Sequence, residues 1–412
     1  MTTLIPQFDL KNGGSTPTGA VNRAINLKLA ETISVKDFGA TGDGVTDDTT
    51  AITNAIASVS TLGGDVLFPV PSVAYKVTTT ISLPAGVRLI GQGANVRWRN
   101  TKTPVKINYT GSVACISVVA SASTVIDAGQ IINIQLDGTN ASANTDGLLL
   151  DASASSSAIE GFYSNELAIT NFTRYQVFIN GEVFDATFDR LSALNPDVAA
   201  DNCVFIQGSA PSQITFNDCW IAPYTASKWA VYQGNGGLDL RFFGGTIASF
   251  STPNSANGVY AFGGLYIYGT HIEGIGTDIN SIGVQYIGST AAYIAPSQCS
   301  GFGTNVKISD GTSNVARGWV IDGNIGGHIA GGKDVWVTAG ASRAGSILQI
   351  GYANGLGTIV DDRKTTDGVY DVNNFYSGAV YSTTGIVFKT PDGTKNYKVS
   401  VDNSGNVISV LV

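Results

Sequence analysis

Charged side chains are scarce in this sequence: Asp, Glu, Lys and Arg make up 13% of 412 residues, about half of the ~25% that is usual in soluble proteins. The balance is acidic, with 23 basic and 31 acidic residues and a net charge of −8. No stripe of Lys and Arg overrides that sign. We therefore exclude a protein that binds along the phosphate backbone of a nucleic acid.

Cysteine, proline and long apolar runs are also in short supply. The four cysteines (Cys115, Cys203, Cys219, Cys299) form no CxxC pair, which excludes a zinc knuckle and predicts buried free thiols. No apolar run approaches the ~18 residues of a membrane span. The N-terminus lacks the charged start and apolar stretch of a signal peptide, so we expect synthesis in a cytoplasm and no insertion into a membrane.

Glycine is the residue in excess. The chain has 50 Gly, only 12 Pro and 43% hydrophobic residues. This composition predicts many short strands joined by turns.

The first third of the chain divides into an N-terminal peptide and a strand-rich segment. Residues 1–32 are too few to bury a core alone, and we expect a short helix over Ala20–Leu29. In the next segment, 33–100, apolar residues at helical spacing from Ala51 to Val59 predict a helix capped by Asp47 or Asp48. Short strands are expected at four places: Val66–Pro69, Tyr75–Val77, Ile81–Leu83 and Val87–Gly91.

Three stretches of this segment carry a family resemblance: VKDFGATGDGVTDDTTAI (35–52), GGDVLFP (63–69) and LPAGVRLIGQG (83–93). They resemble the pectate-lyase-like superfamily, specifically the first turns of phage tailspike proteins. The preceding residues, 15–40, are similar to the anchoring peptides of phage tail proteins. The resemblance implies a homotrimer, fixed to a virion through residues 1–32 and directed at a bacterial surface polysaccharide.

An internal repeat supports the same fold without the resemblance. Seven apolar-x-apolar pairs begin at Leu167, Ala186, Ile214, Leu240, Leu265, Ala292 and Trp319. Their steps are 19, 28, 26, 25, 27 and 27 residues. A second column contains Gly181, Gly208, Gly234, Gly263, Gly288 and Gly311. A common period near 26 predicts an all-β, right-handed parallel β-helix, with Ile169, Phe188, Phe216, Phe242 and Ile267 in one interior column.

The outward positions of these strands suggest a sugar-binding face. Strands alternate faces, which turns Asp189, Asn217, Arg241, Phe243, Tyr266 and Tyr268 outward. Aromatic rings stack on the C–H faces of sugars, while amide and charged groups bind hydroxyls. The substrate-binding candidates are Asn217, Trp220, Arg241, Phe243, Tyr266 and Tyr268. Packing of the rings against a neighbouring chain is the alternative.

Hydrolysis of a glycosidic bond needs two carboxylates. Asp218 lies beside Trp220, an apolar neighbour of the kind that raises a carboxylate pKa. Glu273 follows two rungs later, ~10 Å along the axis, near the upper end of the ~6.5–9.5 Å spacing of an inverting pair. We therefore name Asp218 and Glu273 as catalytic candidates, with Asp189 as the alternate. For each alone, a turn-capping or solvated carboxylate is the competing interpretation.

A lyase needs different groups: a base near the sugar C5 and a cation beside the uronate carboxylate. Arg241 is the candidate cation, with Lys228 or Tyr266 as the base. The acidic group Asp43, Asp47 and Asp48 lacks the order of an EF-hand. We interpret these residues as turn and cap residues and expect neither a metal nor another cofactor.

The sequence thus predicts four parts: an anchor (1–32), a β-helix beginning with a capping helix (33–100), the β-helix proper (101–332), and a β-rich module that caps and trimerises the chain (333–412). In the last part, residues 385–410 predict a three-stranded meander. The expected function is a tailspike of the virion tail that hydrolyses capsule or O-antigen polysaccharide. A non-catalytic receptor-binding spike and a polysaccharide lyase remain the alternatives, and a secreted pectinase is disfavoured.

Overall fold

The protein is described from a computed structural model. It covers residues 7–8, 21, 23–24, 32–93, 105–195, 201–208, 211–223, 225, 228–234, 239–249, 256–274, 278–287, 291–309, 318–327, 329–338, 347–350, 359–361, 375–376, 386–389, 396–401 and 407–411. Within these residues no helix is long and apolar enough to cross a membrane.

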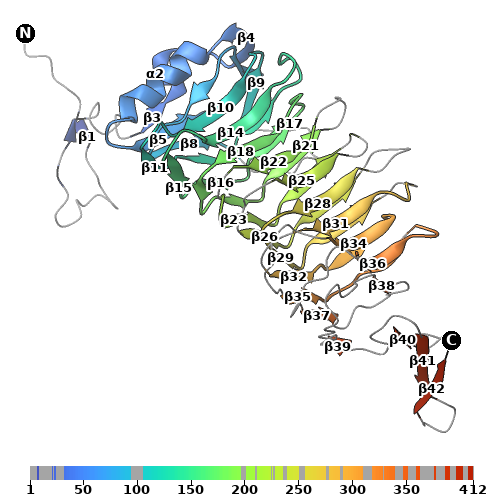
Figure 1. Ribbon diagram of the computed structural model, residues 1–412. Helices are drawn as coiled ribbons and strands as arrows, with labels where there is room; N and C mark the ends of the chain where they lie inside the picture. The colour runs from blue at the N-terminus through green and yellow to red at the C-terminus, as the bar shows by residue number, and fades with distance from the viewer. Residues whose placement is uncertain are drawn as a thin grey trace, which may run out of the picture.

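The chain forms a parallel β-solenoid with about 27 residues per turn. Most rungs contribute one strand to each of three parallel sheets, which we number in the order in which the chain visits them. Figure 1 shows the rungs stacked in one direction, from the N-terminal helix toward β39 (Phe375–Tyr376).

Sheet 1 has 13 strands. They are β3 (Ile33–Ser34), β5 (Gly64–Phe68), β8 (Val87–Gly91), β12 (Gln130–Ile132), β16 (Tyr163–Asn165), β20 (Thr187–Asp189), β23 (Ile214–Asn217), β26 (Asp239–Phe243), β29 (Gly264–Tyr268), β32 (Ala292–Ala295), β35 (Gly318–Ile321), β37 (Ile347–Ile350) and β39.

Sheet 2 has 10 strands. They are β4 (Asp43–Asp47), β6 (Ala74–Val77), β9 (Lys106–Tyr109), β13 (Gln135–Asp137), β17 (Ala168–Thr170), β21 (Ser192–Asn195), β24 (Trp220–Pro223), β27 (Thr246–Ser249), β30 (His271–Gly274) and β33 (Gln298–Ser300).

Sheet 3 has 11 strands. They are β7 (Ile81–Ser82), β10 (Ala114–Val119), β14 (Asp146–Ala152), β18 (Val177–Gly181), β22 (Val204–Gln207), β25 (Trp229–Gln233), β28 (Asn257–Ala261), β31 (Ile282–Tyr286), β34 (Thr304–Ile308), β36 (Lys333–Val337) and β38 (Ile359–Asp361). A small additional sheet joins β11 (Val125–Asp127), β15 (Ala158–Glu160) and β19 (Val183–Phe184).

The interior is filled by stacked apolar columns. Phe188, Phe216 and Phe242 are paired in register, and their rings stack with centroids 5.1 and 5.2 Å apart. Ile267 and Ile294 continue the same column. All five side chains are buried. The column predicted from the repeat is therefore confirmed from Phe188 onward.

The assignment of Ile169 to that column was wrong. Ile169 lies in β17 of sheet 2, opposite Ala193. The residue opposite Phe188 is the buried Ser164, and Phe162 fills the adjoining space with its ring 5.5 Å from that of Phe188. The step of 19 residues was the mark of this error, because it connects two different sheets of neighbouring rungs.

The N-terminal end of the solenoid is covered by α2 (Thr49–Val59), which contacts β5 and β7. Asp48 is its N-cap residue, but its carboxylate accepts hydrogen bonds from the backbone N–H groups of Thr41 and Gly42. The carboxylate of Asp47 accepts the bond from Thr49 N–H, at 3.0 Å. The expected helix and the four expected strands are confirmed. Before this segment, β1 (Gln7–Phe8) pairs with β2 (Arg23–Ala24), so the helix expected over Ala20–Leu29 was wrong at Arg23–Ala24.

Parallel pairing continues past residue 332, where the sequence analysis ended the β-helix. β36 pairs with β34, β38 with β36, and β39 with β37. Beyond them, β40 (Ile386–Lys389), β41 (Asn396–Val401) and β42 (Val407–Leu411) form the predicted antiparallel meander. All four cysteines are free and buried, as predicted, and burial raises the pKa of each thiol.

Candidate functional site

The outward face of sheet 1 carries most of the residues that the sequence singled out. Arg241 pairs with Tyr266, and Phe243 pairs with Tyr268, in neighbouring strands β26 and β29. The three aromatic residues are 43%, 37% and 61% exposed for Phe243, Tyr266 and Tyr268. This face is therefore an exposed aromatic patch beside one guanidinium group, as the alternation of the strands predicted.

Asp189 joins the same face through a network of hydrogen bonds. Its Oδ2 accepts a bond from the Tyr163 hydroxyl at 2.7 Å, and its Oδ1 accepts one from Asn217 Nδ2 at 2.7 Å. Desolvation raises the pKa of Tyr163, and its bond to Asp189 adds to the effect. Both carboxylate oxygens of Asp189 are thus held by side chains of the adjacent rungs.

The cation and the lysine base proposed for lyase chemistry each contact a carboxylate. Arg241 contacts Asp239 at 3.0 Å and lies 6.0 Å from the centre of the Tyr266 ring. Lys228 contacts Asp201 at 2.7 Å. A uronate carboxylate would have to compete with Asp239 for Arg241, which weighs against the lyase alternative.

Asp218 occupies the corner between sheets 1 and 2. Its φ is +48°, its side chain is exposed, and its N–H donates to the carbonyl of Phe243 at 2.8 Å. The same corner position is held by Arg190 in the preceding rung and by Gly244 in the next, both also with positive φ. Its location is that of a turn residue on the surface.

Trp220 and Glu273 belong to sheet 2. Trp220 begins β24, and Glu273 faces outward from β30, where its carboxylate lies 3.7 Å from Nε2 of His271. The Glu273 side chain is 44% exposed. The three carboxylates therefore lie on three parts of the rung: Asp189 on sheet 1, Asp218 at the corner and Glu273 on sheet 2. The corner turns the chain between them, so they do not share one outward face, and their catalytic role stays a prediction.

Sheet 3 carries two hollows that the sequence analysis did not predict. One, of about 450 Å³, is lined by Asn180, Phe205, Gln207, Gly208, Tyr232 and Gly234. The other, of about 340 Å³, is lined by Ala152, Ser153, Ala154, Ser155, Ser156, Asn180, Gly181, Glu182 and Gly208. Because Asn180 and Gly208 border both, the two hollows adjoin on one face.

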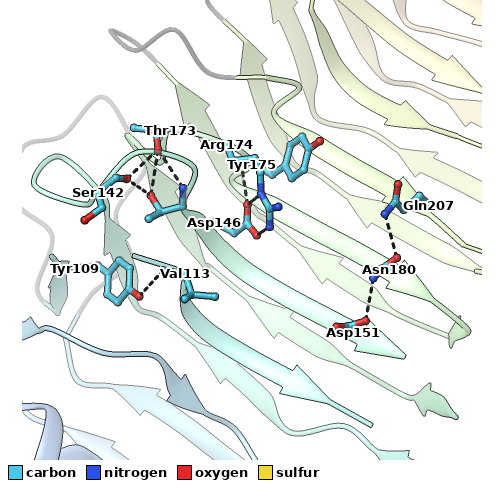
Figure 2. Close-up of polar contacts among 11 residues, drawn as sticks. Tyr109, Val113, Ser142, Asp146, Asp151, Thr173, Arg174, Tyr175, Asn180 and Gln207 are labelled. Carbon is cyan, nitrogen blue, oxygen red and sulfur yellow. Dashed lines mark hydrogen bonds and ion pairs between the residues drawn. The ribbon is translucent and has the colours of Figure 1, made fainter. Parts of the chain in front are cut away.

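A ladder of polar side chains, drawn in Figure 2, passes through Asn180, which borders both hollows. Asn180 Nδ2 donates to Asp151 Oδ1 at 3.0 Å, and Gln207 Nε2 donates to Asn180 Oδ1 at 3.2 Å. Each bond joins adjacent rungs, so the amide groups are fixed in orientation before any ligand arrives. Such a row of oriented donors and acceptors suits the hydroxyl groups of a sugar.

Beside the amide ladder stands a column of aromatic rings. Phe178, Phe205, Tyr232 and Tyr260 are paired in register. The ring centroids of successive members are 5.6, 5.6 and 4.4 Å apart, with interplanar angles of 26°, 25° and 14°. Desolvation and the neighbouring Tyr232 raise the pKa of Tyr260 to about 12. Since the rings stack on one another, Phe205 and Tyr232 form a rigid apolar wall of the larger hollow.

The N-terminal end of this column is anchored by an ion pair, also shown in Figure 2. Arg174 Nε donates to the buried Asp146 at 2.8 Å, and its guanidinium carbon lies 5.3 and 5.1 Å from the ring centres of Tyr175 and Phe178. Burial raises the pKa of Asp146, while the contact with Arg174 acts in the opposite direction. Arg174 therefore ties the first rings to the preceding rung.

The glycine column of the repeat was the available signal for this face. Gly181, Gly208 and Gly234 all line the hollows. A Cβ on Gly208 would lie 2.4 Å from the nitrogen of Gly181, and one on Gly181 would lie 2.1 Å from the carbonyl oxygen of Ala152. Close backbone approach excludes side chains at these positions and leaves space at the surface. Among the described residues, no group of three or more His, Cys, Asp or Glu side chains is placed to hold a metal.

Comparison with known proteins identifies the family. Residues 32–239 match the family model described as rhamnogalacturonase A/epimerase, pectate lyase-like. The chain belongs to this pectate lyase-like family. The resemblance found in residues 35–93 is thereby confirmed.

Individual proteins match this chain only in part. The tail spike protein of Shigella phage Sf6 is 40% identical over 102 residues, which is 24% of this chain and 16% of that protein. A glucan 1,3-beta-glucosidase of Cochliobolus carbonum is 37% identical over 116 residues, 24% of this chain and 14% of the enzyme. Among solved structures, ORF18 of Geobacillus virus E2 matches 94% of this chain and 74% of its own, with a TM-score of 0.57 and 17% identity. At 17% identity, the similarity to ORF18 shows a shared fold only.

Proposed function

We propose that this protein is a tailspike of a phage virion that binds and hydrolyses a bacterial surface polysaccharide along the outward face of sheet 3. The observation that carries the proposal is the larger hollow, which is lined by two oriented amides and two aromatic rings and adjoins the smaller one. The similarity to a phage tail spike supports the placement in a virion tail.

The dimensions of the face suit an extended glycan. The larger hollow, at about 450 Å³, lies within the ~300–1,000 Å³ typical of ligand sites. Neighbouring rungs repeat at ~4.8 Å, so equivalent contacts recur along the axis. A sugar chain lying along the solenoid would present its hydroxyls to Asn180 and Gln207 and its C–H edges to Phe205 and Tyr232.

Glu182 is the candidate acid for hydrolysis. Of the residues that line the two hollows, Glu182 alone carries a carboxyl group. The second carboxylate of the proposed pair is Asp151, which lies one rung away and orients Asn180. In this assignment Glu182 gives its proton to the leaving glycosidic oxygen, and Asp151 takes a proton from the attacking water.

The assignment made from the sequence is the rival. Asp218 and Glu273, or Asp189, would then act on a chain bound over the exposed rings of Phe243, Tyr266 and Tyr268. The exposure of those rings favours them as a second sugar-contacting surface, where Arg241 and Asn217 supply polar contacts.

The test of the function is incubation with a panel of purified capsule and O-antigen polysaccharides, followed by mass spectrometry of the fragments. We expect saturated oligosaccharides from one polysaccharide. Unsaturated fragments would show that the protein is a lyase and not a hydrolase. If a polysaccharide is retained without fragments, the protein is a receptor-binding spike. If the protein neither binds nor cleaves any polysaccharide of the panel, that result contradicts the proposal.

Matched variants locate the chemistry. Glu182→Gln removes a proton donor with little change of shape, and turnover should fall at least ~10²-fold while binding persists. Asp218→Asn, Glu273→Gln and Asp189→Asn are the controls, each expected within a few-fold of the parent. If Asp218→Asn and Glu273→Gln lose turnover and Glu182→Gln does not, the site lies at the corner and sheet 2.

A further inference from the structure

The outward column of sheet 3 does not end with its aromatic rings. Tyr260 pairs with Gln285, Gln285 with Lys307, and Lys307 with Trp336. From Tyr232 in β25 to Trp336 in β36 there are four strand-to-strand steps, or about 19 Å along the axis. The far end of the face therefore differs from the hollows in its chemistry.

At that end two ammonium groups converge on a single indole ring. Lys307 Nζ lies 4.7 Å from the centre of the Trp336 ring, and Lys333 Nζ lies 4.6 Å from it. All three residues are partly buried. Across the described part of the chain, neither lysine lies within ion-pairing distance of a carboxylate.

The positive charges of Lys307 and Lys333 are not balanced by a carboxylate of the described residues. Elsewhere in the described structure, Lys106 and Lys228 each contact an aspartate. Here an aromatic face is the common neighbour of two like charges, and cation–π attraction has to offset their repulsion. Burial lowers the pKa of Lys307, and the charge of Lys333 lowers it further. An anion bound beside Trp336 would relieve both effects.

We propose that Lys307, Lys333 and Trp336 form a subsite for an acidic sugar residue, so that the polysaccharide read by this face carries carboxylate or phosphate groups. The inference rests on the proposed function in taking the ligand to be a glycan on sheet 3. The ring of Trp336 contacts the apolar edge of the sugar, and the two ammonium groups bind its anionic substituent.

The charge of the whole chain opposes an acidic ligand, so local cations are required. With a net charge of −8, the molecule repels a polyanion at long range. Binding of an acidic glycan then depends on local cations, and salt should weaken it. Lys307 and Lys333 supply such a pair in the same outward column as the ring wall of the hollows.

The experiment is NMR of the full chain with its lysines ¹³C-dimethylated, a modification that keeps the ammonium charge. Glucuronate, glucose 6-phosphate and glucose are titrated separately at constant ionic strength. Lys307→Gln and Lys333→Gln assign the two signals, and Lys106, which is paired with Asp137, is the control lysine. We expect saturable shifts of Lys307 and Lys333 with one or both acids and none with glucose.

The acid that binds more tightly identifies the substituent as carboxylate or phosphate. Each glutamine variant should weaken binding about tenfold, as read from the remaining lysine. Equal shifts with glucose, equal shifts of Lys106, or no saturation with either acid would overturn the subsite. The result is independent of catalysis, because a chain that cleaves nothing in the polysaccharide panel still gives a readable titration.

Discussion

Phe216 is enclosed by the rings of the rungs before and after it. Its side chain is buried, and the rings of Phe188 and Phe242 lie parallel to it at 5.1 and 5.2 Å. Phe216→Ala would open a cavity that neither neighbour can fill without leaving its own stack. We expect a loss of about 3–5 kcal/mol in the free energy of unfolding, measured by urea denaturation.

The matched control for this variant is Phe243→Ala in the neighbouring strand β26, one position after Phe242. Because Phe243 is outward and exposed, its removal should change the free energy of unfolding by no more than about 0.5 kcal/mol. Equal losses in both variants would mean that the interior column does not hold the rungs together.

For single residues, the sequence predicted whether a side chain points outward, but not which residues surround it. Alternation correctly turned Arg241 and Tyr266 outward, because period 2 is a property of the strand itself. Alternation does not say where Asp218 and Glu273 lie relative to that face, because the corner between sheets adds few residues and leaves no mark in the apolar pattern. The sequence did not single out Glu182, because the repeat used to choose candidates follows sheet 1 and Glu182 lines a hollow of sheet 3.

At the scale of elements, hydrogen-bonded carboxylates join one rung to the next. Asp137, at the end of β13, accepts bonds from Lys106 at 3.0 Å and from Asn171 at 3.0 Å. Burial alone would raise the pKa of Asp137, but bonds from Thr139, Asn171 and Lys106 outweigh it and leave the pKa below the ordinary value of 3.8. The fold therefore favours the ionised form.

This predicts a specific dependence on pH. The stabilisation from Asp137 is present above the ordinary pKa and is lost as the pH falls through the lowered one. The difference in unfolding free energy between the parent and Asp137→Asn should therefore shrink as the pH falls from about 6 to about 3. Urea denaturation across that range measures it, and a difference that stays constant would remove Asp137 from the acid response.

The elements also show why the fold was easier to predict than the site. The columns through Phe216 and Gly208 depend on a repeat, which any rung can reveal. The hollows of sheet 3 depend on which residues stand opposite one another across rungs of unequal length. Asn180 and Gln207 are 27 positions apart in sequence and bonded in space, and loop lengths that vary between rungs conceal such pairs.

On the scale of the whole molecule, assembly remains a prediction. We expect a parallel trimer in which the meander β40–β42 caps the C-terminal end and sets the register of three chains. Light scattering should give three times the 42.7 kDa of one chain. The mass of a single chain would exclude the trimer.

Removal of residues 1–32 tests the proposed anchor. The shortened protein should keep its assembly state and its action on polysaccharide, because sheet 3 begins only at β7, and it should no longer attach to virions. Most of these residues lie outside the described part of the chain. Loss of polysaccharide binding in the shortened protein would assign them a different role.

The stacking of rungs has a consequence for how such a molecule changes over generations. Each rung contacts chiefly the one before and the one after, and each brings its own strip of all three outward faces. Duplication or loss of a stretch one rung long would lengthen or shorten the outward faces by a single step of ~4.8 Å. The N-terminal end under α2 and the meander β40–β42 would stay unchanged. The outward amides, rings and lysines could then change one rung at a time. A lineage that meets a new surface polymer would need to change the outward residues of only a few rungs.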